Sequence, residues 1–143
     1  MNKSFRGLLA DDSGTRIRLS TNRGLIGYKI VKFRIMPNDP GSANTEHIVK
    51  IFTYEPAANT TVVDFSDSTL LAAGTVNNDL QTSYYPVDSE VIFDNTVVNQ
   101  DIFVSHKSEG TLRACNYYIE LEQIKLDVNE ATVATLKDMR GRE

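Results

Sequence analysis

The sequence predicts an all-β protein: an antiparallel β-sandwich, jelly-roll-like, with a short C-terminal helix or an extended tail. Three observations lead to this class. About eight short strand-like runs are separated by turns rich in Gly, Pro, Asn and Asp, and helices and strands do not alternate as in parallel sheets. Residues 112–126 also alternate in polarity, with Cys115, Tyr117, Ile119 and Leu121 on one face and Asn116, Tyr118, Glu120 and Glu122 on the other. Such alternation predicts a long strand in the middle of an antiparallel sheet, with one buried face and one wet face.

Length and composition indicate a single domain. The chain has 143 residues, of which 41% are hydrophobic, so residues 1–143 can form one sandwich with an N-terminal arm (residues 1–12) and a C-terminal tail (residues 127–143). The net charge of −4, without a basic stripe, argues against a nucleic-acid partner. No apolar run is long enough for a membrane helix, and residues 1–10 lack a signal-peptide pattern. We therefore expect no membrane partner and synthesis in a cytoplasm.

The first half of the chain reads as strands separated by marked turns. Asp11–Gly14 has turn composition, and residues 15–20 alternate as a strand with a charged outer face. Residues 25–36 predict a long strand whose apolar side switches near Ile30–Val31, which indicates a bulge or a passage from core to an oligomer contact. Residues 37–46 predict a loop, because they contain two prolines, and residues 47–54 predict the next strand.

The second half continues this pattern and then changes. We expect strands at residues 61–65, 66–74, 90–93 and 97–105, with one helical turn as the alternative at 66–74, and a loop at 80–87. A turn at residues 107–110 would close a hairpin between the 97–105 strand and the 112–126 strand. Residues 129–140 favour a short helix with Asn129 as N-cap. Its Val133, Leu136 and Met139 would pack on the sheet or on a neighbouring subunit.

No catalytic or metal motif is recognised, so we expect no catalytic residues, no cofactor and no metal site. The histidines are His47 and His106, far apart in sequence from each other and from Cys115. Neither has a nucleophile motif nearby, and neither belongs to the His-x-His pattern of the cupin enzymes. Cys115, the single cysteine, excludes an intrachain disulfide, and its place on the apolar strand face predicts a small core residue.

Other polar groups have a functional and a structural interpretation. Asp11 and Asp12 lack the remaining ligands of a calcium loop, so a plain turn is favoured. The basic residues Lys29, Lys32 and Arg34 could form a binding patch, although a solvated face is the simpler account. The acidic pairs that could serve as glycosidase carboxylates are Asp64 with Asp67 and Glu120 with Glu122. Solvated charge is the simpler account for Glu120 and Glu122, and we expect no enzyme.

A resemblance adds to these observations. Residues 17–22, 28–33, 48–52, 99–104 and 115–122, and the ending 129–140, resemble segments of small proteins encoded by marine tailed bacteriophages. The similarity extends over most of the chain, but the family supplies no site motif to match. The resemblance implies a component of the virion rather than a defined activity. A structural virion protein needs no active site, export signal or disulfide, in agreement with the residues.

The resemblance leads to three functional expectations. The first is a capsid decoration or cement protein on the virion surface that stabilises the shell by non-covalent contacts. Its partner would be the major capsid protein, it would form a homo-oligomer such as a trimer, and its arm and tail would make the lattice contacts. The second is a tail, neck or fibre-associated virion protein. The third is a carbohydrate-binding attachment module that uses tyrosines as stacking platforms: Tyr84, Tyr85, Tyr117 or Tyr118.

Overall fold

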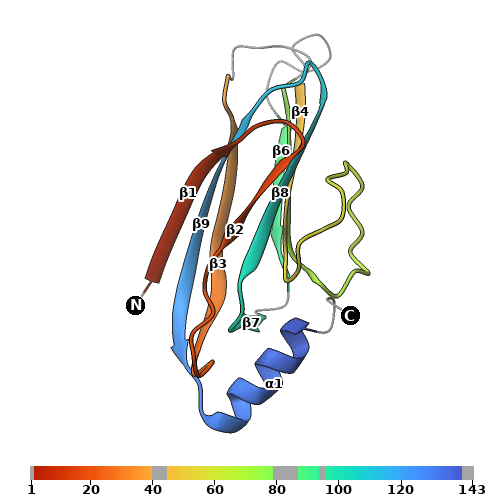
Figure 1. Ribbon diagram of the computed structural model, residues 1–143. Helices are drawn as coiled ribbons and strands as arrows, with labels where there is room; N and C mark the ends of the chain where they lie inside the picture. The colour runs from red at the N-terminus through yellow and green to blue at the C-terminus, as the bar shows by residue number, and fades with distance from the viewer. Residues whose placement is uncertain (1, 40–44, 79–86, 94–95, 140–143) are drawn as a thin grey trace.

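Two antiparallel sheets pack face to face in a computed structural model that describes residues 2–39, 45–78, 87–93 and 96–139 (Figure 1). The four-stranded sheet has the order β1-β9-β3-β7, and the five-stranded sheet has the order β2-β8-β4-β5-β6. All pairings are antiparallel. The predicted all-β sandwich with a short C-terminal helix is thereby confirmed.

The four-stranded sheet is built around β9 (Cys115–Lys125), between β1 (Asn2–Leu9) and β3 (Ile26–Pro37). β7 (Val97–Val98) pairs with the start of β3. The predicted alternation of β9 is confirmed, because Cys115, Tyr117, Ile119 and Leu121 are buried and the intervening residues are not. The register of β3 shifts between Ile30 and Lys32, which confirms the bulge predicted from its change of apolar side.

The five-stranded sheet holds β2 (Ser13–Ile17), β8 (Ile102–Gly110), β4 (Thr45–Phe52), β5 (Leu70–Asn78) and β6 (Val87–Ile92). The inward side chains of both sheets form one core, with Val49, Ile51, Ile102, Ile119 and Leu121 almost fully buried. β5 overlaps the strand expected at residues 66–74, but it begins at Leu70 and continues to Asn78, and residues 66–69 are not strand. Residues 61–65 form no strand, so that expectation was wrong; they belong to an irregular stretch between β4 and β5.

The largest error concerns the expected hairpin. Residues 97–105 are not one strand, because β7 and β8 lie in different sheets and the chain crosses between them at Asn99–Asp101. Residues 107–110 continue β8, and the chain then crosses again to β9 in the other sheet. Buried hydrogen bonds explain the first crossing. The Asp101 carboxylate accepts from the Leu19 amide at 2.8 Å, the Ser20 amide at 3.0 Å and Arg16 Nε at 2.7 Å, which fixes this corner to the end of β2.

The N-terminal segment, expected as an arm, lies mostly in the sheet. Residues 2–9 form β1 and pair with β9 over their whole length, and a turn at Asp11–Asp12 leads into β2 of the other sheet. Asp12 has a left-handed φ of 55°, a conformation that aspartate tolerates in turns. The plain turn predicted for this aspartate pair is confirmed.

Helix α1 (Val128–Met139) crosses one end of the sandwich beside β7 (Figure 1). Its N-cap is Asp127, whereas the sequence had predicted Asn129. The Glu130 amide donates to Asp127 Oδ1 at 2.7 Å, and the Asp127 amide donates to Glu130 Oε1 at 3.3 Å. This reciprocal pair is a capping box, which satisfies two backbone donors at once. No helix of the described ranges is long and apolar enough to cross a membrane.

Candidate functional site

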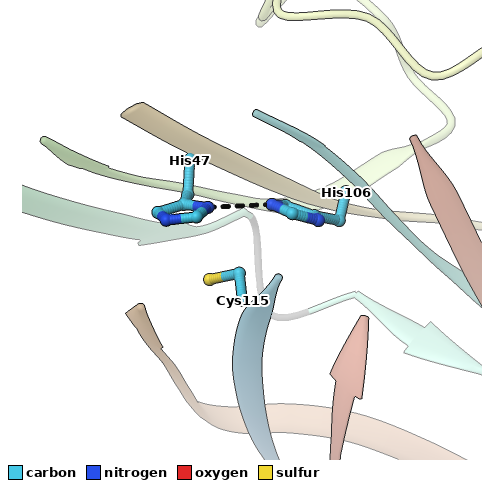
Figure 2. Close-up of side chains that lie close together, drawn as sticks. All are labelled: His47, His106 and Cys115. Atoms are coloured by element: carbon cyan, nitrogen blue, oxygen red, sulfur yellow. Dashed lines mark hydrogen bonds between the residues drawn. The ribbon is translucent and has the colours of Figure 1, made fainter. Parts of the chain in front are cut away.

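Three buried side chains from three different strands meet between the two sheets at the end opposite α1. His47 on β4 and His106 on β8 project from the five-stranded sheet, and Cys115 projects from the start of β9 in the other sheet (Figure 2). Their exposed fractions are 1%, 0% and 0%. One ring nitrogen of each histidine and the thiol sulfur of Cys115 lie within 4.8 Å of one another.

Strand periodicity explains why all three point inward. His47 has the same parity along β4 as Val49 and Ile51, which are both fully buried. His106 likewise shares the parity of Ile102 and Val104 along β8, and Cys115 that of Tyr117 and Ile119 along β9. Residues two apart on a strand share a face, so these apolar neighbours carry the polar side chains into the core. This signal was clear in the sequence for Cys115, whereas β4 and β8 carry buried residues of both parities.

The two imidazoles form a directed hydrogen bond. His47 Nδ1 and His106 Nε2 are 3.0 Å apart, and His106 Nδ1 is 2.9 Å from the Ala10 carbonyl oxygen. A carbonyl can only accept, so His106 Nδ1 carries the proton and donates to Ala10. Neutral His106 therefore has a lone pair on Nε2, which accepts the proton of His47 Nδ1. The backbone of Ala10 thus determines the tautomers of both rings.

The turn between β1 and β2 covers this cluster. Ala10 accepts from His106, and the Asp11 carboxylate accepts from the Ser108 amide at 2.9 Å and from the Ser108 hydroxyl at 2.6 Å. Ser108 is itself fully buried and pairs with His47 across the sheet. Asp11 therefore places a negative charge beside the imidazoles, with Lys107 Nζ 4.0 Å from its other oxygen.

Burial controls the protonation of the cluster. Desolvation, aided by repulsion from His106, lowers the pKa of His47 to about 4. Desolvation likewise lowers the pKa of His106, against the opposing effect of its hydrogen bond to Ala10. Burial raises the pKa of the Cys115 thiol to about 12. At neutral pH the cluster therefore consists of two neutral imidazoles and a protonated thiol.

This arrangement suits ligation better than catalysis. A nucleophilic cysteine requires an accessible thiolate in an electropositive setting, whereas Cys115 is enclosed and protonated. Two imidazoles and one sulfur are, however, donors that Zn²⁺ accepts. The expectation of no metal site treated these three residues as far apart, and the fold brings them together. Cys115 is a buried core residue, as predicted.

The opposite end of the molecule presents an exposed apolar surface on α1. The helix buries its small residues Ala131 and Ala134, whereas the exposed fraction is 70% for Val128 and 66% for both Val133 and Leu136. Val133, Leu136 and Met139 therefore do not pack on the sheets of this chain, so that part of the expectation was wrong. Val128 and Leu136 flank a hollow of about 470 Å³, also lined by Leu25 and Thr132. We call the exposed set Val128, Val133, Leu136 and Met139 the α1 apolar surface.

Buried hydrogen bonds hold α1 in this orientation. Asn99 Nδ2 lies 2.7 Å from Thr135 Oγ1, 3.1 Å from the Ala131 carbonyl oxygen and 3.0 Å from the Gly24 carbonyl oxygen. The Asp138 carboxylate accepts a hydrogen bond from the backbone amide of Asn99 at 2.8 Å. Because Asn99 and Asp138 are almost fully buried, these bonds determine which face of α1 meets the sandwich.

The other candidate residues are dispersed. Tyr118 lies on the outer face of β9, in register with Arg6 and Arg34 on the flanking strands, beside a hollow of about 500 Å³. Tyr117 points the other way and is 9% exposed. Tyr84 and Tyr85 lie outside the described residues. The tyrosine platform expected from sequence is therefore reduced to Tyr118 among the residues that the structure places.

The expected acidic pairs have structural partners. Asp64 accepts from the amide and hydroxyl of Ser66, and Asp67 accepts from those of Thr69. Glu122 forms a 3.5 Å ion pair with Lys29, and Glu120 accepts from the Tyr118 hydroxyl at 3.4 Å. Of the expected basic patch, Lys29 and Arg34 are thus both paired with carboxylates, Arg34 with Glu90 at 3.4 Å.

Comparison of the sequence with protein-family models and with curated proteins finds no match.

Proposed function

We propose that this chain is a phage virion structural protein, a decoration or cement protein that binds the major capsid protein and stabilises the shell. The resemblance to small proteins of marine tailed phages suggests the particle. The observation that carries the binding role is the α1 apolar surface. Buried bonds through Asn99 and Asp138 hold this surface outward, where it can meet another molecule.

The edge strand β1 supports the same role. Within the described part of the chain, β1 pairs only with β9, so its outer edge can pair with a further strand. Its side chains are largely exposed, with Leu8 at 53%. The lattice contacts we propose are therefore an edge strand at one terminus and a docked helix at the other.

Copy number tests the proposal first. Quantitative mass spectrometry on purified particles of the source phage would compare this chain with the major capsid protein. Several hundred copies would support a shell protein. A dozen or fewer would transfer the chain to the tail, neck or fibre, which is the second candidate. Absence from the particle would overturn a virion role.

Point variants test the proposed surface more sharply than truncation. Deleting residues 127–143 would remove the exposed residues and also uncover the buried Asn99. Replacing Val133 and Leu136 with serine leaves Ala131, Ala134 and Asp138 in place. We expect this double variant to bind shells that lack the protein at least 10-fold more weakly.

Val62→Ser is the matched control, because Val62 is 69% exposed on the irregular stretch between β4 and β5. It should bind shells as the unchanged protein does. Equal binding by the α1 double variant would exclude α1 from the interface. Native mass spectrometry of the free protein would show whether three copies assemble before they meet the shell.

Tyr118 favours one further candidate, a carbohydrate-binding attachment module. Tyr118 pairs across the sheet with Arg6 and Arg34, all three line the 500 Å³ hollow, and Lys32 Nζ is 5.9 Å from the Tyr118 ring centre. Aromatic rings flanked by polar side chains can stack on sugars. A glycan array with the unchanged protein and with Tyr118→Ala tests this function. Binding that disappears in the variant would support it, and absence of binding by the unchanged protein would exclude it.

A further inference from the structure

We propose that His47, His106 and Cys115 form a transition-metal site that prefers Zn²⁺ and ties the two sheets together. The proposal is independent of any virion role. Its three donors come from strands of both sheets, so one ion would cross-link β4 and β8 to β9. Figure 2 shows the two rings side by side, with the cysteine approaching them from the opposite sheet.

The distances are close to those that zinc requires. With Zn–N bonds of about 2.0–2.1 Å and a Zn–S bond of about 2.3 Å, tetrahedral geometry separates two nitrogens by about 3.3 Å and nitrogen from sulfur by about 3.6 Å. The imidazole nitrogens that face each other are 3.0 Å apart, and all three donors lie within 4.8 Å. Ligation therefore needs the two facing nitrogens to separate by a few tenths of an ångström and the Cys115 sulfur to approach them by up to about 1.2 Å. A water molecule would supply the fourth ligand.

The surrounding groups already orient the ligands. His106 donates its Nδ1 proton to the Ala10 carbonyl, which leaves Nε2 free to ligate, and metal-bound histidines usually have such a partner. His47 would present Nδ1 once its proton has moved to Nε2, without a change in charge. Ligation requires neutral imidazoles, and the hydrogen bonds to Ala10 and between the two rings are those of neutral tautomers.

Charge and proton balance follow from the same groups. The Cys115 thiol would lose its proton to solvent as the Zn–S bond forms, so each bound ion releases one proton. The ion and thiolate together carry one positive charge. The Asp11 carboxylate beside the imidazoles compensates this charge, and its hydrogen bonds to Ser108 hold it in place. Lys107 Nζ, 4.0 Å from the Asp11 carboxylate, adds a positive charge that partly opposes this compensation.

A refolding experiment with Co²⁺ and Zn²⁺ tests the proposal. The untagged, reduced protein would be unfolded, freed of metal with a chelator, and refolded with one equivalent of ion, because the enclosed site requires loading during folding. With Co²⁺ we expect one ion per chain and a near-ultraviolet thiolate-to-cobalt charge-transfer band. With Zn²⁺ we expect release of one proton per chain and a rise in thermal midpoint of roughly 10 °C.

Cys115→Ser and Asp64→Ser are the paired variants. Cys115→Ser removes the thiolate and should abolish the band, whereas Asp64→Ser removes an exposed carboxylate and should leave it unchanged. The wild-type readings decide the proposal even if Cys115→Ser fails to fold. Wild-type protein that folds without a band, and without a change in thermal midpoint, would show that the cluster is a hydrogen-bonded core pair. A band that persists in Cys115→Ser would assign the metal to another site.

Discussion

The two ends of the sandwich distribute polarity in opposite ways. At the end covered by the β1–β2 turn, the core encloses His47, His106 and Cys115. At the other end, α1 turns valine and leucine outward and buries alanine. Burial of polar groups reduces stability unless each group finds a partner, and exposure of large apolar groups suits an association surface. We infer that the first end is built for internal linkage and the second for external contact.

Among the changes considered, His106→Ala should lower the free energy of unfolding the most, and it acts at the end that encloses the histidines. The substitution leaves a cavity and removes the acceptor for His47 Nδ1. We expect a loss of about 4 kcal/mol in the free energy of unfolding of the metal-free protein. Urea unfolding followed by circular dichroism measures it. His106→Gln retains a polar side chain and should lose roughly half as much, and a loss below about 1 kcal/mol for His106→Ala would mean that the cluster is loosely packed.

Asn99→Ala should have the second largest effect on the free energy of unfolding. It acts at the end of the sandwich that α1 covers. The variant removes the side chain that faces the Gly24 and Ala131 carbonyls and Thr135 Oγ1. We expect about 3 kcal/mol of destabilisation and faster hydrogen exchange in α1 than in β9. Asn59→Ala is the control, since Asn59 makes an exposed hydrogen bond to Asp12. Equal exchange in α1 of Asn99→Ala and the unchanged protein would show that other contacts hold the helix.

The third largest loss of stability should come from acid, which protonates the Asp101 carboxylate. Although burial opposes it, hydrogen bonds from the Ser20 and Leu19 amides and from Arg16 lower the pKa of Asp101 to about 2. A carboxyl whose folded pKa lies below its unfolded value of 3.8 stabilises the protein above that value, and the contribution disappears as pH falls towards 2. We expect it to be about 2 kcal/mol.

The comparison of unchanged protein with Asp101→Asn isolates this carboxyl from others that titrate nearby. Thermal unfolding between pH 7 and pH 2 should show the variant less stable at pH 7, and the difference should shrink below about pH 4. A difference that stays constant with pH would mean that the Arg16–Asp101 contact is structural without being ionic.

Alternation along single strands made much of the fold predictable. The buried face of β9 and the bulge of β3 follow from which residues lie two apart, and this pattern is local. The pairing of β8 and β9 was mispredicted, because proximity in sequence favours a hairpin. The crossover at Asn99–Asp101 depends instead on bonds to Leu19, Ser20 and α1, which are distant in sequence.

The candidate site and the helix face show the same limit. The inward direction of Cys115 was predictable from the alternation of β9, but β4 and β8 carry buried residues of both parities, and the convergence of the three side chains depends on how the two sheets pack. For α1, the apolar repeat of Val133, Leu136 and Met139 suggested a buried face. The tight contact with β7 and the Asn99 bonds instead select alanine. Small residues allow the helix backbone to approach closely, and this preference is not visible in a hydrophobic repeat.

The smallest stability effect should come from the α1 apolar surface itself. Val133→Ser and Leu136→Ser should each change the free energy of unfolding by less than about 0.5 kcal/mol, since both side chains are 66% exposed. Ala134→Leu should lose about 1–3 kcal/mol, because Ala134 is buried where the helix meets the sandwich. Urea unfolding of the three variants measures the contrast. If the serine variants destabilised the free protein as much as Ala134→Leu, the exposed side chains would be serving the fold. If the serine variants instead keep the stability of the unchanged protein but lose partner binding, the large apolar side chains of α1 serve contact with another molecule.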